Sequence, residues 1–327
     1  MTEPLLRIDA LTVDFPTDDG VVHAVDGVSF DVFPGEIVAV VGESGSGKSV
    51  TAMSVLRLLR EPPARVSAGA LTFRDRDLRA MSRAELRKVR GGPVGMIFQD
   101  PMTALNPVMT IGDQIAEAVL LHQSTRDRKA ARRRAVELLR LVGVPDAEQR
   151  ARQYPHEFSG GMRQRAMIAM AIANDPDLII ADEPTTALDV TIQAQVLELV
   201  RKAQRESGAA TVLITHDLGV VAELADRVVV MYAGRVAETA TVEDLFASPR
   251  HPYTVGLLKS LPRVDTATDE LYAIPGNPPN MIAPPAGCPF HPRCPLARDR
   301  CVTDRPELRE VGDGRQSACH YAEEVGP

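Results

Sequence analysis

The sequence predicts an α/β fold in which helices cover a mainly parallel β-sheet. Short apolar runs typical of buried strands alternate with helical periodicity along the chain of 327 residues. A glycine-rich loop joins one of these runs to the helical pattern that follows it. The composition, with 44% hydrophobic and 25% charged residues, is that of an ordinary globular protein. We therefore expect one large domain with a smaller appendage.

The expected elements follow a β-then-α order. Two strands separated by the turn sequence TDDG open the chain, and a hairpin-like segment turns at Ala233–Gly234. Helical periodicity is expected at 51–60, across most of 111–173 and at 190–206. The expected strands span residues 5–15, 21–32, 36–42, 177–183, 210–217 and 226–240.

The composition of the chain changes near residue 245, where we place a domain boundary. From residue 247 it offers one short helix and then the run IPGNPPNMIAPPAGCPFHPRCP, which is too rich in proline for regular elements. The prediction is a main domain of residues 1–245 and a small irregular C-terminal extension of residues 246–327.

Residues 42–49 read GESGSGKS and match the phosphate-binding pattern GxxxxGK[ST] in full. A chance glycine-rich turn is the alternative, but the pattern lies between a strand and a helix, as phosphate binding requires. Lys48 is expected to reach the β- and γ-phosphates, and the Ser49 hydroxyl to ligate Mg²⁺. The residues expected to bind the nucleoside triphosphate here are Gly42, Ser44, Gly45, Ser46, Gly47, Lys48, Ser49 and Val50.

The apolar run DLIIADE ends in two acids where a buried strand is expected to end. Asp182 is expected to hold the Mg²⁺ shell and contribute to nucleotide binding, and Glu183 to polarise the attacking water as a general base. Such a run is common by itself, so the prediction depends on its combination with the phosphate-binding loop. Together the two motifs predict an enzyme that binds and hydrolyses a nucleoside triphosphate.

The stretch FSGGMRQRAMIAMAIANDPDLIIADEPTTALD resembles the ATP-binding cassette (ABC) family, the motor subunits of ABC transporters. The resemblance covers residues 5 to about 245. It implies a P-loop NTPase of ABC type, with a RecA-like parallel-sheet core, an antiparallel β subdomain and a helical subdomain at about 105–175.

Further residues take roles through this resemblance. Gln99, in MIFQDPMTALNP, resembles the Q-loop glutamine, so Mg²⁺ would be held by Ser49 and Gln99 with Asp182 nearby. His216, in LITHD, resembles the switch histidine that contacts the γ-phosphate, and Phe15 lies where the adenine-stacking aromatic usually lies. The resemblance thus implies catalytic roles for Glu183, His216, Lys48 and Gln99.

The resemblance also implies a dimer. Ser159, Gly160, Gly161 and Met162 look like the family signature, which touches the ATP held by the opposite subunit. The signature reads FSGGM here, whereas the commonest form is LSGGQ, so Met162 lacks a side-chain amide. Asp189, in TALD, looks like the D-loop residue at the dimer interface.

The sequences HPYTVGLLKSLP and GCPFHPRCP look like the C-terminal extension of oligopeptide and dipeptide importer ATPases. This implies three kinds of partner: two permease subunits, an extracytoplasmic solute-binding protein, and a second ATPase that is a different chain. No apolar run approaches the ~18 residues that span a bilayer, and the N-terminus does not resemble a signal peptide. We expect a peripheral protein at the cytoplasmic face of the cell (inner) membrane. Nickel or another small solute is the alternative cargo.

All four cysteines lie in the extension, at Cys288, Cys294, Cys301 and Cys319. Four thiols in a proline-rich segment with little apolar matter predict a metal staple. Structural Zn²⁺ typically uses closer pairs of cysteines, whereas Fe–S clusters accept wider spacing and often have Cys followed by Pro. The spacing favours a [4Fe–4S] cluster over Zn²⁺, and free thiols are the third alternative.

A cassette ATPase that acts on nucleic acid is the main alternative function. The net charge of −7 argues against a nucleic-acid binder. From Cys288 onward the chain carries six arginines against seven acidic residues, so this segment has no net positive field. We expect no nucleic-acid partner, and we interpret the basic run at 126–134 as a solvated helix face rather than a lipid site.

Overall fold

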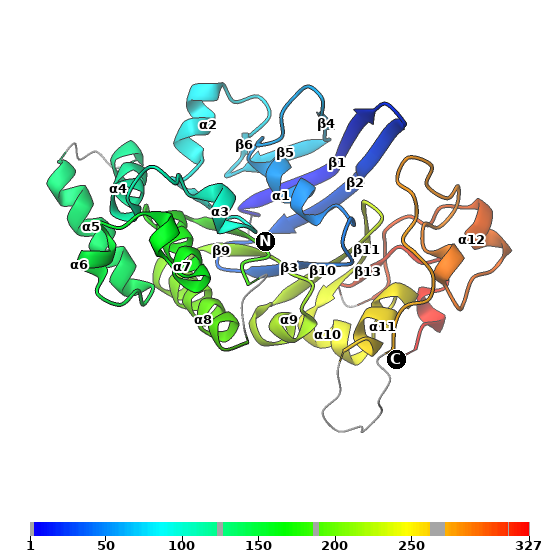
Figure 1. The fold of residues 1–327 in the computed structure, drawn as a ribbon. Helices are drawn as coiled ribbons and strands as arrows, with labels where there is room; N and C mark the ends of the chain where they lie inside the picture. The colour runs from blue at the N-terminus through cyan, green and yellow to red at the C-terminus, as the bar shows by residue number, and fades with distance from the viewer. Residues whose placement is uncertain (1–2, 123–126, 186–189, 262–271, 313, 327) are drawn as a thin grey trace. The chain divides into compact units, whose positions relative to one another are not determined.

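The computed structural model describes residues 3–122, 127–185, 190–261, 272–312 and 314–326 (Figure 1). These residues form two compact units, each assembled from several segments of the chain. The first unit comprises Met1–Leu5, Phe33–Glu36 and Ala80–Ile214, and the second comprises Leu6–Val32, Ile37–Arg79 and Thr215–Pro327. The predicted boundary near residue 245 stays a prediction.

The first unit contains a parallel sheet with helices around it. The strands follow the order β7 (Val94–Ile97), β8 (Leu178–Asp182) and β9 (Ala210–Ile214). Every residue of β8 and β9 is buried, which explains why both read as unbroken apolar runs. The helices are α2 (Arg83–Val89), α3 (Pro101–Ala104), α4 (Ile111–His122), α5 (Arg128–Leu141), α6 (Ala147–Arg150), α7 (Gly160–Ala171) and α8 (Val190–Ser207).

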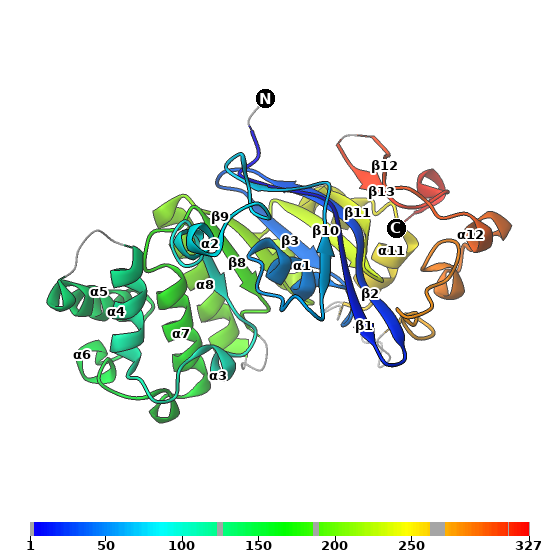
Figure 2. The same ribbon diagram turned by 90° about the horizontal axis from the view of Figure 1, so that it is seen from above.

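The basic run of α5 lies on one face of an amphipathic helix. Ala131, Ala135, Leu138 and Leu139 are buried at helical spacing. Three cations of the run are exposed, which agrees with the predicted solvated face: Lys129, Arg132 and Arg133. Helices α4, α5 and α6 gather at one end of this unit (Figure 2).

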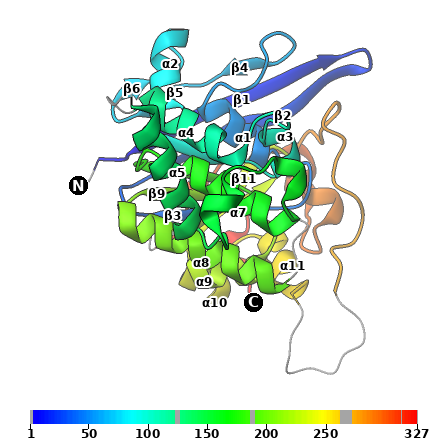
Figure 3. The same cartoon turned by 60° about the vertical axis from the view of Figure 1, so that its left-hand side comes forward.

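The second unit contains an antiparallel sheet, drawn in blue and cyan in Figure 3. Its strands follow the order β2 (Gly20–Val32), β1 (Leu6–Thr17), β5 (Ala70–Phe73) and β6 (Arg76–Asp77), and β4 (Arg65–Ser67) also pairs with β1. The sequence patterns predicted β1 and β2, whereas β4, β5 and β6 are too short to give a period. The helices of this unit are α1 (Lys48–Val55), α9 (Leu218–Leu224), α10 (Val242–Ala247), α11 (Pro252–Lys259) and α12 (Asp299–Thr303).

The C-terminal extension adds strands to the second sheet of this unit. In that sheet β3 (Ile37–Val41) lies parallel to β10 (Arg227–Tyr232), and β10 pairs with β11 (Arg235–Thr241). The extension continues the ladder, since β13 (Gln316–Ser317) pairs with β11 and with β12 (Arg309–Glu310). The described residues between 272 and 290 form no helix or strand, as the proline content predicted.

Two aromatic side chains of the extension pack together with a third from β10. Tyr253 and Phe290 are at most 2% exposed, and both pack on Tyr232 of β10. The ring centroids of Tyr232 and Tyr253 lie 4.5 Å apart, and that of Phe290 lies 5.2 Å from Tyr232 and 5.4 Å from Tyr253. We call these residues the aromatic cluster. Such edge and tilted contacts stabilise beyond their buried area.

None of the helices in the described parts of the chain is both long enough and apolar enough to cross a membrane.

Glu238 of β11 is a carboxyl group buried inside the second unit. It is fully shielded from solvent, and its Oε1 accepts the backbone N–H of Arg250 at 2.6 Å. Burial raises the pKa of this carboxyl to about 7. The folded protein therefore binds more protons than the unfolded chain between about pH 4.5 and pH 7. The contribution of Glu238 to stability falls as pH rises through that window.

We expect Glu238→Gln to stabilise the protein at pH 8 by about 1–3 kcal/mol, because the amide removes a buried charge. The gain should disappear at pH 5, where the native carboxyl is already protonated. Urea denaturation of both proteins at the two pH values measures this difference. Equal gains at pH 5 and pH 8 would show that charge burial is not the cause.

Candidate functional site

The phosphate-binding loop leaves the buried strand β3 and enters α1 at Lys48, as predicted. Its backbone turns sharply at Gly42, with φ +151°, and at Gly47, with φ +98°. A Cβ atom on Gly42 would lie 2.1 Å from the Met231 carbonyl oxygen, and one on Gly47 would lie 2.5 Å from that of Ala24. These two positions therefore require glycine on grounds of both space and conformation.

Lys48 is folded back against the loop that precedes it. The side chain is buried, and its Nζ donates to the carbonyl oxygens of Gly42 at 2.8 Å and Glu43 at 3.0 Å. The Ser46 N–H also donates to Glu43 O, at 3.2 Å. The ammonium group is thus held at the turn where the phosphates are expected to bind.

His216 and the phosphate-binding loop line the same cavity. The cavity measures about 540 Å³ and includes Gly42, Glu43, His216 and Arg293 in its wall. The Thr215 N–H donates to Val40 O of β3 at 3.2 Å, which fixes the segment that carries His216. Phe15 lies in β1, opposite Val22 of β2, and is half-buried.

The first unit brings Gln99 and Glu183 together. Asp182 ends β8 and is 5% exposed, whereas Glu183 follows it with φ +45°, a conformation that a non-glycine residue adopts at a cost. The Glu183 N–H donates to Ile214 O at 2.9 Å, and its Oε2 accepts Gln99 Nε2 at 3.0 Å. The main-chain bond and the amide together orient the carboxylate that was assigned the general-base role.

The signature residues begin helix α7. Ser159 caps this helix, since its Oγ accepts the Met162 N–H at 3.4 Å. Gly160 is exposed, and a Cβ atom there would meet nothing within 4 Å. The buried Gln164 donates to Pro184 O at 2.6 Å, which ties α7 to the loop after Glu183. Gln164 was not among the predicted site residues, because a glutamine inside a helix carries no signal of its own.

The predicted site residues divide between the two units. Lys48, Ser49 and His216 belong to the second unit, and Gln99, Asp182, Glu183 and the signature belong to the first. The assembly of one ATP site from both sets stays a prediction. Asp189 and the rest of TALD lie outside the described residues.

The four cysteines line one small cavity but do not form a metal site in this structure. None is paired in a disulfide, and the cavity between them measures about 20 Å³, room for about one water molecule. In the part of the chain that the structure describes, no three His, Cys, Asp or Glu side chains are arranged to hold a metal ion. The predicted [4Fe–4S] cluster is therefore not supported by this geometry.

Burial makes three of the four thiols weaker acids than an exposed cysteine. Burial raises the pKa of Cys288, Cys294 and Cys319 to about 11, and the neighbouring thiols add to this effect. The three thiols are therefore protonated at neutral pH. A metal ion that bound them would have to displace their protons.

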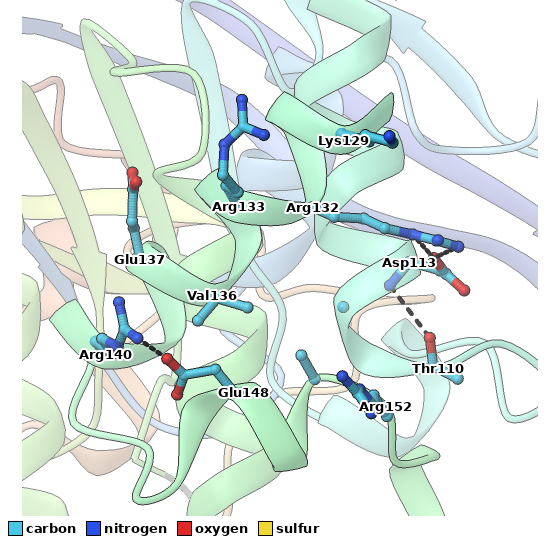
Figure 4. Close-up of a pocket in the computed structure, with 12 residues that line it drawn as sticks. Thr110, Asp113, Lys129, Arg132, Arg133, Val136, Glu137, Arg140, Glu148 and Arg152 are labelled. Carbon is cyan, nitrogen blue, oxygen red and sulfur yellow. Dashed lines mark hydrogen bonds and ion pairs between the residues drawn. The ribbon is translucent and has the colours of Figure 1, made fainter. Parts of the chain in front are cut away.

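A larger cavity, of about 840 Å³, lies among α4, α5 and α6 in the first unit (Figure 4). Basic side chains line it, but several are matched by acids: Arg132 Nη2 lies 2.8 Å from Asp113 Oδ1, and Arg140 pairs with Glu148. None of the predicted ATP-binding residues lines this cavity. Its size therefore does not make it the nucleotide site.

Family models match two parts of the chain. Residues 25–186 match the model described as ABC transporter. Residues 237–301 match the model described as the C-terminal region of oligopeptide/dipeptide transporters.

Curated relatives match nearly the whole chain. It is 54% identical over 323 residues to the oligopeptide transport ATP-binding protein OppD of Mycobacterium tuberculosis, covering 98% of this chain and 52% of the relative. The chain thus spans about half the length of the mycobacterial relatives that it matches. It is 56% identical over 293 residues to the dipeptide transport ATP-binding protein DppD of Bacillus subtilis, covering 90% of this chain and 87% of the relative.

A solved structure shares the fold. The dimeric ATP-binding cassette MJ0796, described in a post-hydrolysis state with bound ADP and Pi, aligns with a TM-score of 0.65 at 26% identity. The alignment covers 72% of this chain and 98% of that one. These comparisons confirm the predicted P-loop NTPase fold of ABC type.

We expect Gly42→Ala to weaken ATP binding at least about tenfold, because the new Cβ collides with the fixed Met231 carbonyl and must displace the loop. Gly45→Ala is the matched control. Gly45 also has a positive φ, +79°, but nothing lies within 4 Å of its added Cβ. Isothermal titration with ATP and Mg²⁺ gives both dissociation constants. Equal affinity in the two variants would contradict the steric argument.

Proposed function

Because the chain belongs to the family of ABC transporter ATP-binding proteins, we propose that it is the ATP-hydrolysing subunit of an oligopeptide or dipeptide importer. The observation that most directly supports the peptide cargo is the C-terminal extension, which matches the oligopeptide/dipeptide transporter region over residues 237–301. The relatives named for peptide transport extend that similarity along nearly the whole chain. ATP hydrolysis would drive the peptide across the membrane.

In this proposal the loop N–H groups and Lys48 bind the β- and γ-phosphates. Ser49 and Gln99 would hold Mg²⁺ with Asp182 nearby, and the ion would neutralise charge on the phosphates. Glu183 would accept a proton from the attacking water. The hydrogen bond from Gln99 to Glu183 supports this arrangement, because it links the proposed metal ligand to the proposed base.

His216 would also contact the γ-phosphate. Its place in the wall of the cavity that also includes Gly42 and Glu43 supports this role. The loop amides and Lys48 would stabilise the charge that spreads over the transferring phosphoryl group. Preorganised donors of this kind contribute most of the rate enhancement in phosphoryl transfer.

The signature residues would act on the ATP of a second subunit. The open surface around Ser159 and Gly160 supports this role, since a partner's nucleotide could approach Gly160 without a clash. Asp189 would cross the interface between the two subunits. We propose that the second ATPase is a different chain, and that two nucleotides close the dimer until hydrolysis reopens it.

The remaining partners follow from the importer assignment. Two permease subunits would form the path through the membrane, and an extracytoplasmic solute-binding protein would deliver the peptide. The ATPase would then lie at the cytoplasmic face of the membrane as a peripheral subunit. We propose no nucleic-acid partner, given the net charge of −7.

We propose in addition that the four cysteines hold a metal staple, with a [4Fe–4S] cluster preferred to Zn²⁺. The convergence of all four thiols on one cavity supports a shared ligand, although the cavity as it stands has room for far less than a cluster. Cys288, Cys294, Cys301 and Cys319 would be the ligands, and the group would serve to fold the extension.

We expect the protein purified without oxygen to be brown, to absorb near 400 nm, and to contain about four irons per chain. A colourless protein with one zinc per chain would support a metal staple made of Zn²⁺ in place of the cluster. A colourless and metal-free protein would refute the staple. Cys301→Ser is a useful companion variant, because this thiol is the most buried of the four and its loss should lower the metal content.

We expect Glu183→Gln to keep ATP binding but to lower ATP hydrolysis at least about a hundredfold, because general-base catalysis typically contributes that much. Cells that lack the gene should take up labelled tripeptides again when they receive the wild-type gene, but not the Glu183→Gln gene. Near wild-type hydrolysis in the variant would show that Glu183 is not the general base. Restored nickel uptake without peptide uptake would refute the peptide cargo, and salt-sensitive DNA or RNA binding would favour a non-transport function.

A further inference from the structure

Glu43, the second residue of the phosphate-binding loop, is held by two residues of the C-terminal extension. Its N–H donates to the Tyr253 hydroxyl at 2.8 Å. Its carboxylate receives both terminal nitrogens of Arg293, with Nη1 2.6 Å from Oε2 and Nη2 2.9 Å from Oε1. The Glu43 carbonyl oxygen, by contrast, accepts Lys48 Nζ and the Ser46 N–H from within the loop. The extension therefore anchors the loop from outside.

Arg293 is itself fixed on several sides. Its side chain is only 4% exposed, and Nε donates to Pro275 O at 2.9 Å. Nη2 donates to Ile274 O and Nη1 to the Tyr232 hydroxyl, both at 3.3 Å. The guanidinium lies within 6 Å of two rings of the aromatic cluster. A planar donor held in this way fixes the carboxylate at one position, which a flexible lysine could not do.

The backbone of Arg293 belongs to a tight turn between two of the cysteines. The Arg293 N–H donates to Phe290 O at 3.0 Å, and the Cys294 N–H donates to His291 O at 3.3 Å. The Cys288 N–H donates to Cys301 O at 2.8 Å, which joins this turn to the next cysteine along the chain. The position of Arg293 thus depends on the folding of residues 288–301, which we call the cysteine segment.

The same ion pair affects the charge beside the expected phosphates. Glu43 is adjacent to Gly42, whose carbonyl oxygen contacts Lys48. An unpaired carboxylate at this position would repel a triphosphate, and Arg293 neutralises it. The pair is also part of the wall of the cavity that includes His216. Its loss would therefore disturb both the shape and the potential of the site.

We propose that Arg293 is a positioning residue for the phosphate-binding loop, which it holds through Glu43, and that the folded cysteine segment thereby raises the affinity for nucleotide phosphates. This proposal rests on the proposed function, because it concerns the ATP site that the function requires. In this proposal Arg293 acts on ATP through the loop, by way of its ion pair with Glu43. In this way the folded extension contributes to nucleotide affinity through its contacts with Glu43.

The first test compares Arg293→Met and Arg293→Lys with Arg309→Met. Arg309 is the matched control, since it forms a two-pronged pair with Glu323 in the same extension (2.7 and 2.8 Å) and is largely exposed. Titration calorimetry with ATP and Mg²⁺ measures affinity, and thermal unfolding without nucleotide checks that each variant is folded.

We expect Arg293→Met to weaken ATP binding about tenfold and Arg293→Lys about threefold. Arg309→Met should stay within about twofold of the wild type. In ATPase assays, Arg293→Lys should raise KM for ATP and leave kcat unchanged. A merely structural ion pair would instead lower the unfolding temperature of the Arg293 variants and leave their ATP affinity intact, which would overturn the proposal.

A double variant tests the route through Glu43. If Arg293 acts on the loop through this carboxylate, Arg293→Met should cause little further loss in a Glu43→Gln background. Losses that add in full would overturn the proposed route. Should Arg293→Met fail to fold, Arg293→Lys in the two backgrounds gives the same comparison.

The two proposals fail in distinguishable ways. A wild-type protein that binds no ATP would overturn both the importer ATPase and the role of Arg293. A wild-type protein that binds ATP, with folded Arg293 variants of equal affinity, would overturn the role of Arg293 alone.

Discussion

The tight path of the backbone between β3 and α1 is the constraint on which the rest of the site depends. The loop passes so close to neighbouring main chain that Gly42 faces the Met231 carbonyl and Gly47 faces that of Ala24. The hairpin between β10 and β11 supports the loop directly, because the Gly234 N–H donates to Ser46 O at 3.0 Å. Backbone packing and the neighbouring groups therefore fix the shape of the loop, and Gly42 and Gly47 leave no room for a side chain.

Some of the candidate site residues belong to local sequence patterns and could be predicted from them. The phosphate-binding loop and the acidic end of β8 each occupy a few consecutive residues, so periodicity and spacing were enough to place them. The fully buried strands were predicted for the same reason. The short strands β4, β5 and β6 were not, since two to four residues are too few to show a period. The residues at the start of α7 were assigned only through the resemblance to the ABC family.

The contacts that were missed join residues far apart in the chain. Glu43 and Arg293 are separated by 250 positions, and an arginine between two cysteines suggests no partner by itself. Gln164 and the positive φ of Glu183 depend on packing that only the folded chain reveals. For the four cysteines, the sequence predicted that they would lie together around a metal ion. They do line one cavity, but in the described part of the chain they are not arranged as metal ligands.

The extension beyond residue 245 shares its interior with the residues that precede it. It lengthens the sheet through β13, contributes two of the three rings in the aromatic cluster and holds both the N–H and the carboxylate of Glu43. The junction is therefore a poor place to cut or graft. A chimaera that joined this extension to another cassette would leave Arg293 buried without a counter-charge, unless a carboxylate was carried across at the position of Glu43.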